Sequence, residues 1–310
     1  MLDGLYMLFS LLIFPGFAFL LLYSLAFEWL DRVMVARLQG RIGPPWYQPL
    51  ADLVKLFAKE DILPTGAHAT ACALLPMVSL AAVLTAAMHI PVAWQAGSAF
   101  EGDLIVVVFL LSIPSLAYFL AGWLSVSVYS VLGGNRSLLQ YFAYEVPLLM
   151  ALIGPAILSG SWSITAIAQQ QHGSIWMAFV QPVGFLLAVV GLIGKLKRSP
   201  LDIPKAKSEI SAGPLTEFSG RKLALWRLTL QMTTVVGIFL LVNLFMGGGS
   251  GGWLPAPLGF VVKTLLVLVL LSVVEVLYAR LRIDQLADIG WKVLAPLALL
   301  QLAVTLLMRG

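Results

Sequence analysis

The feature that most constrains this chain is the recurrence of long apolar runs. Of its 310 residues, 60% are hydrophobic and only 11% are charged, whereas a soluble domain carries about a quarter charged residues. Runs close to or above 18 residues recur along the chain, and each is long enough to cross a bilayer as a helix. A transmembrane barrel would alternate apolar and polar positions instead. The sequence therefore predicts an all-α integral membrane protein, with residues 1–310 forming a single polytopic membrane domain.

We expect eight transmembrane spans, each close to the roughly 20 residues that cross the hydrocarbon core. They lie near residues 5–27, 69–90, 104–124, 138–160, 175–194, 228–246, 258–279 and 290–308. The first run has no basic segment before it and is too long for the core of a signal peptide, so we interpret it as a retained helix.

Lysine and arginine are confined to every second connection. The basic connections follow spans 1, 3, 5 and 7, at about 28–68, 125–137, 195–227 and 280–289. The other three, near 91–103, 161–174 and 247–257, contain neither residue. Because basic loops stay in the cytoplasm, the large loops are predicted to be cytoplasmic and both termini to lie outside.

Charge, cysteine and histidine usage exclude several classes of function. The net charge of +4 is not gathered into a basic patch with interleaved aromatic residues, so nothing indicates nucleic-acid binding. The one cysteine, Cys72, has no partner for a disulfide or a metal site. The histidines, at 68, 89 and 172, lack the spacing of metal ligands. We expect no metal, cofactor or redox centre bound by this chain.

The first basic connection contains one amphipathic segment, QPLADLVKLFAKE at 48–60. As a helix it places Leu50, Leu53, Val54 and Phe57 on one face. Two interpretations fit this pattern: a helix lying on the membrane surface or against a partner, and a helix packed on the protein's own spans.

Three ionisable residues fall inside predicted spans. Glu145 lies about 13 Å along the helix from Arg136, at a depth where a carboxylate costs roughly 2.5–3.5 kcal/mol on insertion scales. Pro147 frees a backbone carbonyl close by. Such a carboxylate usually marks an ion or proton path; the alternative is an ion pair within the bundle that serves assembly. Lys263 and Glu275 lie near opposite ends of span 7, where long side chains reach the interface, so structural roles are the alternative for them.

The connection after span 5 has an unusual composition for a tether. Three prolines interrupt any helix, and Ile210 and Phe218 are too apolar for a free linker. We expect an ordered loop that folds back on the mouth of the bundle and brings Asp202, Glu209 and Glu217 to the cytoplasmic edge. The alternative is a solvated basic loop that binds lipid headgroups.

Three cytoplasmic segments resemble those of one family of membrane proteins. They read DRVMVARLQGRIGPPWYQPLADLVKLFAKEDILP at 31–64, GWLSVSVYSVLGGNRSLLQYFAYEV at 122–146 and RSPLDIPKAKSEISAGPLTEFSGRK at 198–222. The motif GRIGP followed by QPLADxxKLxxKExxxP is highly specific. Over essentially its whole length, the chain resembles the membrane subunit of respiratory complex I that carries the quinone cavity. It also resembles that subunit's relatives in energy-converting membrane-bound nickel–iron hydrogenases and formate hydrogenlyases.

The resemblance implies a subunit at the heel of an L-shaped complex in a prokaryotic cytoplasmic (inner) membrane. Its loops would dock a peripheral arm made of an iron–sulfur small subunit and a catalytic large subunit. That arm would hold the iron–sulfur clusters and, in hydrogenases, a nickel–iron centre. Its other neighbours would be antiporter-like membrane subunits and lipid. Redox energy released in the arm would drive proton or sodium translocation in the membrane.

Matching the segments position by position assigns roles by resemblance. The proton path would include Glu145, the buried glutamate of the YEV segment, together with Asp202, Glu209, Glu217 and Glu275. The residues that would face the peripheral subunits are Arg37, Arg41, Arg136, Lys205, Lys207 and Arg221.

Two departures from the family pattern favour the hydrogenase branch. Complex I members usually carry glutamate at the positions of Lys195, Lys205 and Lys207. Lysines there repel protons and lower carboxylate pKa values, where glutamates would share protons. The first loop is also short, because GRIGPP runs almost directly into WYQP, where quinone-reducing relatives usually carry extra residues. We therefore expect a coupling subunit of hydrogenase type, in which no quinone is needed.

Three other interpretations remain open. The same role in an NADH- or other donor:quinone oxidoreductase would require bound quinone. A stand-alone ion transporter with Glu145 as its ion site would show internal repeats with broken helices, and we find no such repeat. A purely structural anchor would leave Glu145 without a task.

Overall fold

The computed structural model describes residues 9–92, 99–173, 175–249 and 254–309, apart from the side chains of Lys207 and Ser208. Within these ranges seven helices are long and apolar enough to cross a membrane. They are Phe9–Leu38, which contains α2 (Phe17–Leu38), α4 (Ala69–His89), α5 (Asp103–Leu124), α6 (Val128–Ser159), α11 (Gly220–Met246), α12 (Ala256–Leu277) and Ile283–Arg309. The last consists of α13 (Ile283–Ile289), a π-helical turn (Gly290–Leu294) and α14 (Ala295–Arg309).

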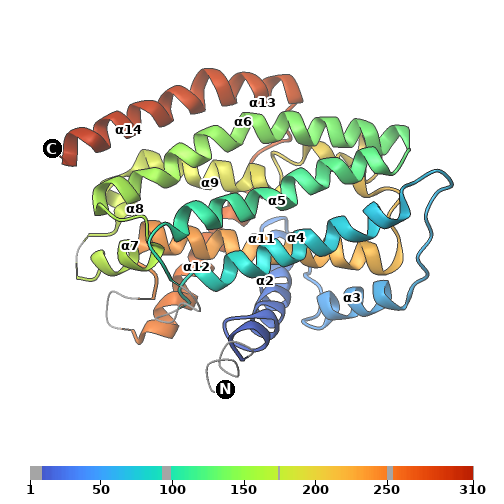
Figure 1. Cartoon of the computed structure of the whole chain (residues 1–310), viewed down its shortest axis with the longest axis horizontal. Coiled ribbons are helices and arrows are strands. Elements are labelled where there is room, and N and C mark those ends of the chain that lie inside the picture. The colour runs from blue at the N-terminus through green and yellow to red at the C-terminus, as the bar shows by residue number, and fades with distance from the viewer. Residues whose placement is uncertain (1–8, 93–98, 174, 250–253, 310) are drawn as a thin grey trace.

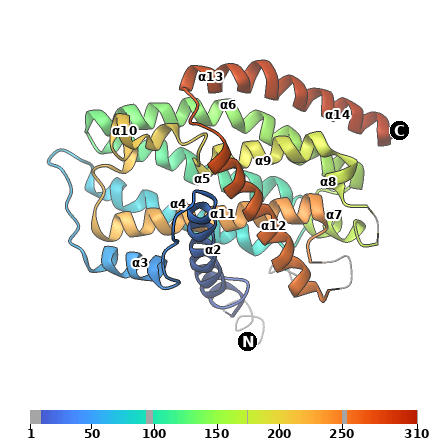
Figure 2. The same ribbon diagram turned by 180° about the vertical axis from the view of Figure 1, so that it is seen from behind.

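The shorter helices fill the connections. They are α3 (Gln48–Ala58), α7 (Ile164–Gln170), α8 (Met177–Val180), α9 (Pro182–Leu196), α10 (Lys207–Ile210) and two 3₁₀ turns at Ile203–Lys205 and Gly213–Leu215. Helices α4, α5, α6, α9 and α14 run roughly side by side along the long axis (Figure 1). Helices α2 and α12 cross them obliquely on the other face (Figure 2).

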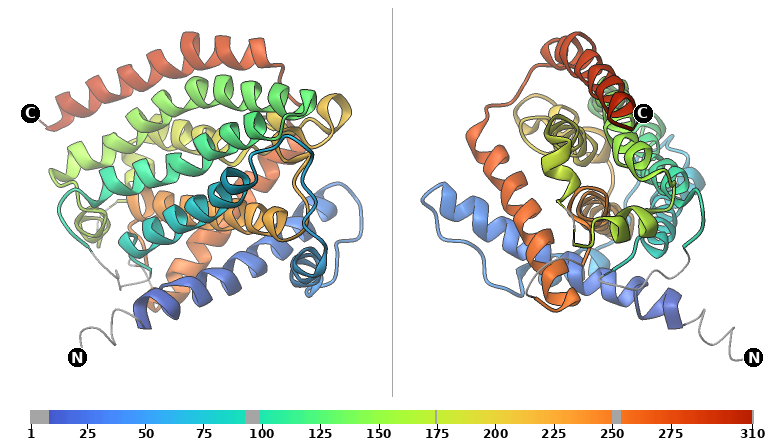
Figure 3. Two further views of the ribbon diagram at one scale, coloured as in Figure 1. Left: turned by 45° about the vertical axis from the view of Figure 1, so that its right-hand side comes forward. Right: turned by 90° about the vertical axis from the view of Figure 1, so that its left-hand side faces the viewer.

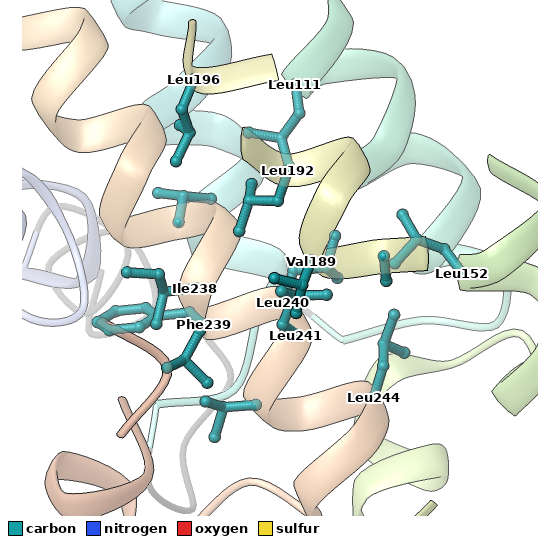
Figure 4. Packing of buried hydrophobic residues seen from close by; sticks show 14 of the residues in the cluster. Leu111, Leu152, Val189, Leu192, Leu196, Ile238, Phe239, Leu240, Leu241 and Leu244 are labelled. Atoms are coloured by element: carbon teal, nitrogen blue, oxygen red, sulfur yellow. The ribbon is translucent and has the colours of Figure 1, made fainter. Parts of the chain in front are cut away.

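Helix α11 is the core around which the others pack. Its 18-residue apolar window is 83% buried, as expected for a helix that is hydrophobic on all sides. Leu192 and Leu196 of α9 meet Leu240 and Leu241 of α11, with Leu152 of α6 close by (Figure 4). The aromatic rings of Phe239 and its neighbours on α2 and α12 complete this core. The apolar residues outside the core remain exposed, as on a surface that faces lipid.

The connections are sorted to two ends of the bundle. Helices α3 and α10 lie at one end, and α7, α8 and the end of α14 lie at the other (Figures 2 and 3). The first end carries the basic connections and the second the connections without lysine or arginine. The alternation of charge along the sequence therefore corresponds to a separation in space.

Several predicted boundaries were wrong in the same direction. The first helix continues to Leu38 instead of ending near 27, α6 begins at Val128 instead of 138, and α11 begins at Gly220 instead of 228. The predicted connections 28–68, 125–137, 195–227 and 280–289 shrink to 39–68, 125–127, 197–219 and 278–282. Hydropathy detects only the part of a helix in the hydrocarbon, whereas these helices continue beyond it into polar turns that pair with other elements. The predicted start of span 1, at residues 5–8, lies outside the described residues.

The predicted span 175–194 is not one continuous helix. It divides at Gln181 into α8 and the 15-residue α9, which is about 22 Å long and shorter than the roughly 30 Å hydrocarbon core. Pro182 explains the break, because proline lacks an N–H and disfavours helical geometry at the residue before it. The Gln181 side chain at the break is buried, and its Nε2 donates to Thr305 Oγ1 of α14 at 3.2 Å.

The amphipathic helix after span 1 is confirmed as α3. Leu53 packs against the bundle and is 9% exposed, while Leu50, Val54 and Phe57 remain on the surface. Both sequence interpretations thus describe part of this helix: one apolar residue packs on the protein's own helices, and three stay available to lipid or a partner.

The connection after α9 is ordered, as its apolar content predicted. Ile203, Ile210 and Phe218 are each 3–4% exposed. Gln140 of α6 fixes the start of the connection, because its Nε2 donates to the carbonyls of Gly194 at 2.9 Å and Leu201 at 2.7 Å. These contacts hold the loop across the mouth of the bundle.

Two structural details answer questions raised by the sequence. Pro147 frees the carbonyl of Ala143, and Gly290 packs so close that a Cβ there would lie 2.5 Å from that oxygen. Lys263 does not extend to the interface. It is 4% exposed, and its Nζ donates to the carbonyls of Met246 and Gly248 at 2.6 and 2.9 Å. A cation in that place stabilises the negative end of α11, so the structural alternative for Lys263 is correct.

Candidate functional site: a charged cavity and a buried ion pair

Glu145 is ion-paired inside the bundle. Its Oε1 lies 2.8 Å from Lys195 Nζ and accepts a hydrogen bond of 2.5 Å from Ser112 Oγ. Glu145 and Lys195 are each only 4% exposed. The other carboxylate oxygen, Oε2, has no hydrogen-bond partner among the described residues. Three helices, α6, α9 and α5, therefore converge on a pair of charges that solvent hardly reaches.

Close packing of α9 on α6 brings the two charges together. A Cβ at Gly194 would lie 2.8 Å from the ring of Tyr144, so glycine permits this approach directly beside Lys195. An apolar groove of about 480 Å³ between α5 and α6 reaches the pair from the outer face, and Ser112 and Glu145 are among its lining residues. The pair thus lies between the interior and a surface that another membrane helix or lipid would cover.

A second polar region is a cavity of about 470 Å³ at the end of the bundle that carries the basic connections. It lies between α2, α11, α12 and the loop after α9. Eight charged side chains line it, four acidic and four basic: Glu28, Asp31, Asp202, Glu275, Lys197, Arg198, Lys205 and Arg280. Its remaining walls include Phe27, Leu230 and Leu268, so charged and apolar surfaces face each other.

The carboxylates of this cavity already have cationic or polar partners. Arg198 bonds to Asp31 and lies 3.2 Å from Glu275. Arg280 binds Asp202 with two nitrogens, the Nε–Oδ1 distance being 2.6 Å. The hydrogen bond to Asp202 raises the pKa of Arg280 above its usual range. These pairs tie the loop after α9 to α2 and α12.

The remaining acid, Glu28, accepts hydrogen bonds from Arg32 and Gln231. Arg32 also reaches Asp52 of α3 at 2.9 Å, and this bond lowers the pKa of Asp52. The helix α3 is thereby connected to the wall of the cavity.

The two cavity lysines differ from the arginines, because no carboxylate lies within ion-pair distance of either among the described residues. Their ammonium groups approach the buried ring of Tyr118, Lys197 at 4.7 Å and Lys205 at 5.9 Å from its centroid. Burial lowers the pKa of Lys197 to about 7 and that of Lys205 to about 8, and the positive charges of Lys205 and Arg198 add to the respective effects. Lys205 is more exposed than Lys197, so hydration offsets more of the depression of its pKa.

The predicted path carboxylates fall into three places. Asp202 and Glu275 line the charged cavity, and Glu145 lies in the buried pair. Glu209 is exposed and ion-paired with Arg136 in a neighbouring cavity of about 540 Å³. The hydrogen bond from Arg136 lowers the pKa of Glu209. Glu217 is half-buried and does not line the charged cavity.

The predicted docking residues are also divided. Arg37, Arg41 and Arg221 are exposed at the end of the basic connections. Lys205 points into the charged cavity instead, and Arg136 is held by Glu209. Lys207 begins α10, but its side chain lies outside the described part of the chain.

Sequence reasoning missed Glu28, Asp31 and Lys197 as cavity residues. The first two occur in EWLD, directly after the apolar run of span 1, and three residues apart they share one helical face. That signal was available. Lys197 carried a weaker one, since only the fold shows that it occupies the left-handed position after α9 (φ 51°).

The described residues contain no group of three or more His, Cys, Asp or Glu side chains that could hold a metal ion. The cavity offers charged side chains and two lysines, a lining better matched to a charged or strongly polar occupant than to a neutral apolar ring.

Fold and site together define a multi-pass helical membrane protein with ionisable groups held inside its bundle. A family model described as NADH dehydrogenase matches residues 11–306, and the chain belongs to this family. An NADH-quinone oxidoreductase membrane-complex component from Dehalococcoides mccartyi (strain ATCC BAA-2266 / KCTC 15142 / 195) is 36% identical over 299 residues, which cover 93% of this chain and 83% of that protein. The component of the same name from Bacillus thuringiensis subsp. konkukian is 34% identical, with coverage of 96% and 94%.

A solved structure is also similar over the whole chain. It is that of a membrane-bound sulfane sulfur reductase, an archaeal respiratory membrane complex. One of its chains superposes with a TM-score of 0.87 at 28% identity, covering 98% of this chain and 100% of that one. The likeness therefore extends to the arrangement of all the helices described above.

Proposed function

We propose that this chain is the membrane coupling subunit of a complex-I-like, redox-driven ion-translocating complex of hydrogenase type in a prokaryotic cytoplasmic membrane. The observation that carries the proposal is a succession of ionisable groups from the loop end into the bundle. Asp202 and Glu275 line the cavity, and Lys197 lies near enough to Lys195 and Glu145 for both to affect its pKa. Ionisable groups inside a membrane protein usually mark ion or proton paths.

The surface at the loop end supports docking of a peripheral arm. Arg37, Arg41 and Arg221 are exposed there beside large apolar side chains, with Ile42 96% and Trp46 73% exposed. Exposed apolar residues next to arginines are typical of a protein interface. We assign this face to the iron–sulfur and catalytic subunits, and the groove between α5 and α6 to an antiporter-like membrane subunit.

Hydrogenase type is supported by Lys195, Lys205 and Lys207 and by the short first loop. A second candidate is the quinone-cavity subunit of a quinone oxidoreductase. The names of the similar proteins and the size of the cavity favour it. In both cases redox centres would reside in partner subunits.

Purification in mild detergent tests the proposal, with subunits identified by mass spectrometry and metals, flavin and quinone quantified. We expect nickel and iron–sulfur clusters with the iron–sulfur and catalytic subunits, and no quinone. Quinone or flavin without nickel would favour the second candidate. Recovery of the chain alone, with ion transport after reconstitution, would refute both and identify a transporter.

Substitution of the interior pair tests the path. In Glu145→Gln we expect loss of ion pumping in an assembled complex. Because this change leaves Lys195 without its partner, the double variant Glu145→Gln/Lys195→Gln is needed to show that the loss does not arise from misfolding. Unchanged pumping in either assembled variant would refute a role of the pair in translocation.

A further inference from the structure

The charge distribution within the cavity is uneven in a way that the proposed function does not use. Each carboxylate near the two lysines is matched by another cation: Glu145 by Lys195, Asp202 by Arg280, and Glu275 by Arg198. Members of these three pairs, together with the two lysines themselves, are the charged groups that act on Lys197 and Lys205. The two ammonium groups therefore remain without an ion pair of their own among the described residues.

Lys197 is held in this position at a conformational cost. It follows α9 in the left-handed region at φ 51° and ψ 45°, where glycine or asparagine is usual and other residues are uncommon. Its side chain is turned inward and the residue is 4% exposed. Strained backbone with a buried charge is found where a function requires it more often than elsewhere.

A third donor completes the arrangement. Arg198 uses Nη2 and Nε on Asp31 and Glu275, but its Nη1 is buried without a hydrogen-bond partner among the described residues. Lys197, Arg198 and Lys205 all line the same cavity. The site thus offers two ammonium groups and one guanidinium edge, and an oxyanion with several acceptor oxygens is the ligand that satisfies such donors.

We propose that this cavity binds a phosphate-class oxyanion, held by Lys197, Lys205 and Arg198. The apolar part of the wall, which includes Phe27, Leu230 and Leu268, also accommodates the first methylene groups of a phospholipid, so the phosphate is either a lipid headgroup or a free anion. The inference concerns the cavity alone and holds whether the complex is of hydrogenase or quinone-reducing type.

Bound anion would also correct the depressed pKa values of the two lysines. A negative charge beside them favours their protonated forms, so binding takes up protons at neutral and alkaline pH. The affinity is therefore expected to fall as the pH rises from about 7 to about 9, through the pKa values of about 7 and about 8.

The experiment uses the purified complex, stripped of loosely bound lipid, and measures retained phosphorus by native mass spectrometry. It then titrates inorganic phosphate, and separately compares nanodiscs of phosphatidylcholine with and without phosphatidylglycerol. We expect one tightly held phosphate-bearing ligand per complex. Lys197→Gln and Lys205→Gln are each expected to weaken binding at least about tenfold, since each removes a charge-assisted hydrogen bond. Lys292→Gln, which changes an exposed lysine, is the matched control and should bind as the wild type.

The arms separate the sources and can overturn the proposal. Retention only from nanodiscs containing phosphatidylglycerol identifies a lipid headgroup, and saturation by inorganic phosphate identifies a free anion. If neither binds, or if both lysine variants bind as the wild type, the proposal is wrong. It is equally wrong if an acidic segment of a partner subunit cross-links into the cavity of the intact complex while phosphate is absent. Should Lys197→Gln fail to assemble, Lys205→Gln alone decides the question, because its backbone carries no left-handed strain.

Discussion

Removal of Lys195 should destabilise the bundle far more than its replacement together with Glu145. At the observed separation of 2.8 Å, the attraction is about 6 kcal/mol at an effective dielectric constant of about 20, and desolvation of both groups offsets much of it. In Lys195→Met the carboxylate would stay buried with only Ser112 as partner, because its Oε2 already lacks one. Breaking such a pair costs about 3–5 kcal/mol.

The double variant should recover most of this loss. Glu145→Gln/Lys195→Met leaves no uncompensated charge, and replacing both partners of a buried pair is often close to neutral. We expect its stability to lie within about 2 kcal/mol of the wild type. The exposed pair Lys292–Asp288 has a similar distance of 2.7 Å, and Lys292→Met should cost no more than about 1 kcal/mol because solvent screens it.

Thermal unfolding of the purified protein in one detergent, followed by intrinsic fluorescence, gives the comparison. On the order of 2 °C per kcal/mol, the single variant should unfold roughly 6–10 °C lower than the wild type. Equal stabilities of the wild type and Lys195→Met would refute the pairing. A double variant as unstable as the single one would show that packing, and not charge, explains the loss.

Three further outcomes are expected. Gly194→Leu should destabilise the protein by about 1–3 kcal/mol, because even a Cβ meets the Tyr144 ring at 2.8 Å, whereas Ala at the same position should cost less; a more stable Leu variant would contradict the packing. Arg41→Glu should release the peripheral subunits during purification while Arg309→Glu, at the other end, does not, as read from subunit stoichiometry; co-purification unchanged by Arg41→Glu would remove that residue from the docking face. Burial lowers the pKa of Lys205 to about 8, so the unfolded chain binds more protons between about pH 8 and 10.5 and stability should rise with pH in that window; Lys205→Gln should flatten the rise, and an unaltered pH profile would show that the lysine is hydrated.

Some of the site was predictable and some was not, for identifiable reasons. The cost of a carboxylate in span 4 singled out Glu145, and that reasoning needs only one residue and its depth. Its partner could not be found in the same way, since Lys195 lies 50 positions later and meets it through the packing of α9 on α6. Asp202 and Glu275 were selected from resemblance and depth, and the structure brings them to one cavity. Glu28 was overlooked because the predicted span ended before it.

Hydropathy, charge alternation and proline placement act through the chain's local encounter with lipid and water, so the sequence alone determined the helical class, the amphipathic helix α3 and the sorting of basic connections to one end. The cavity, the matched ion pairs and the two unmatched lysines depend on which side chains face one another after helices far apart in sequence have packed. Burial strengthens an electrostatic contact only once its neighbours are in place. Tertiary structure alone therefore decided that Lys195 neutralises a buried glutamate, while Lys197, two residues later, faces a cavity with no carboxylate within ion-pair distance among the described residues.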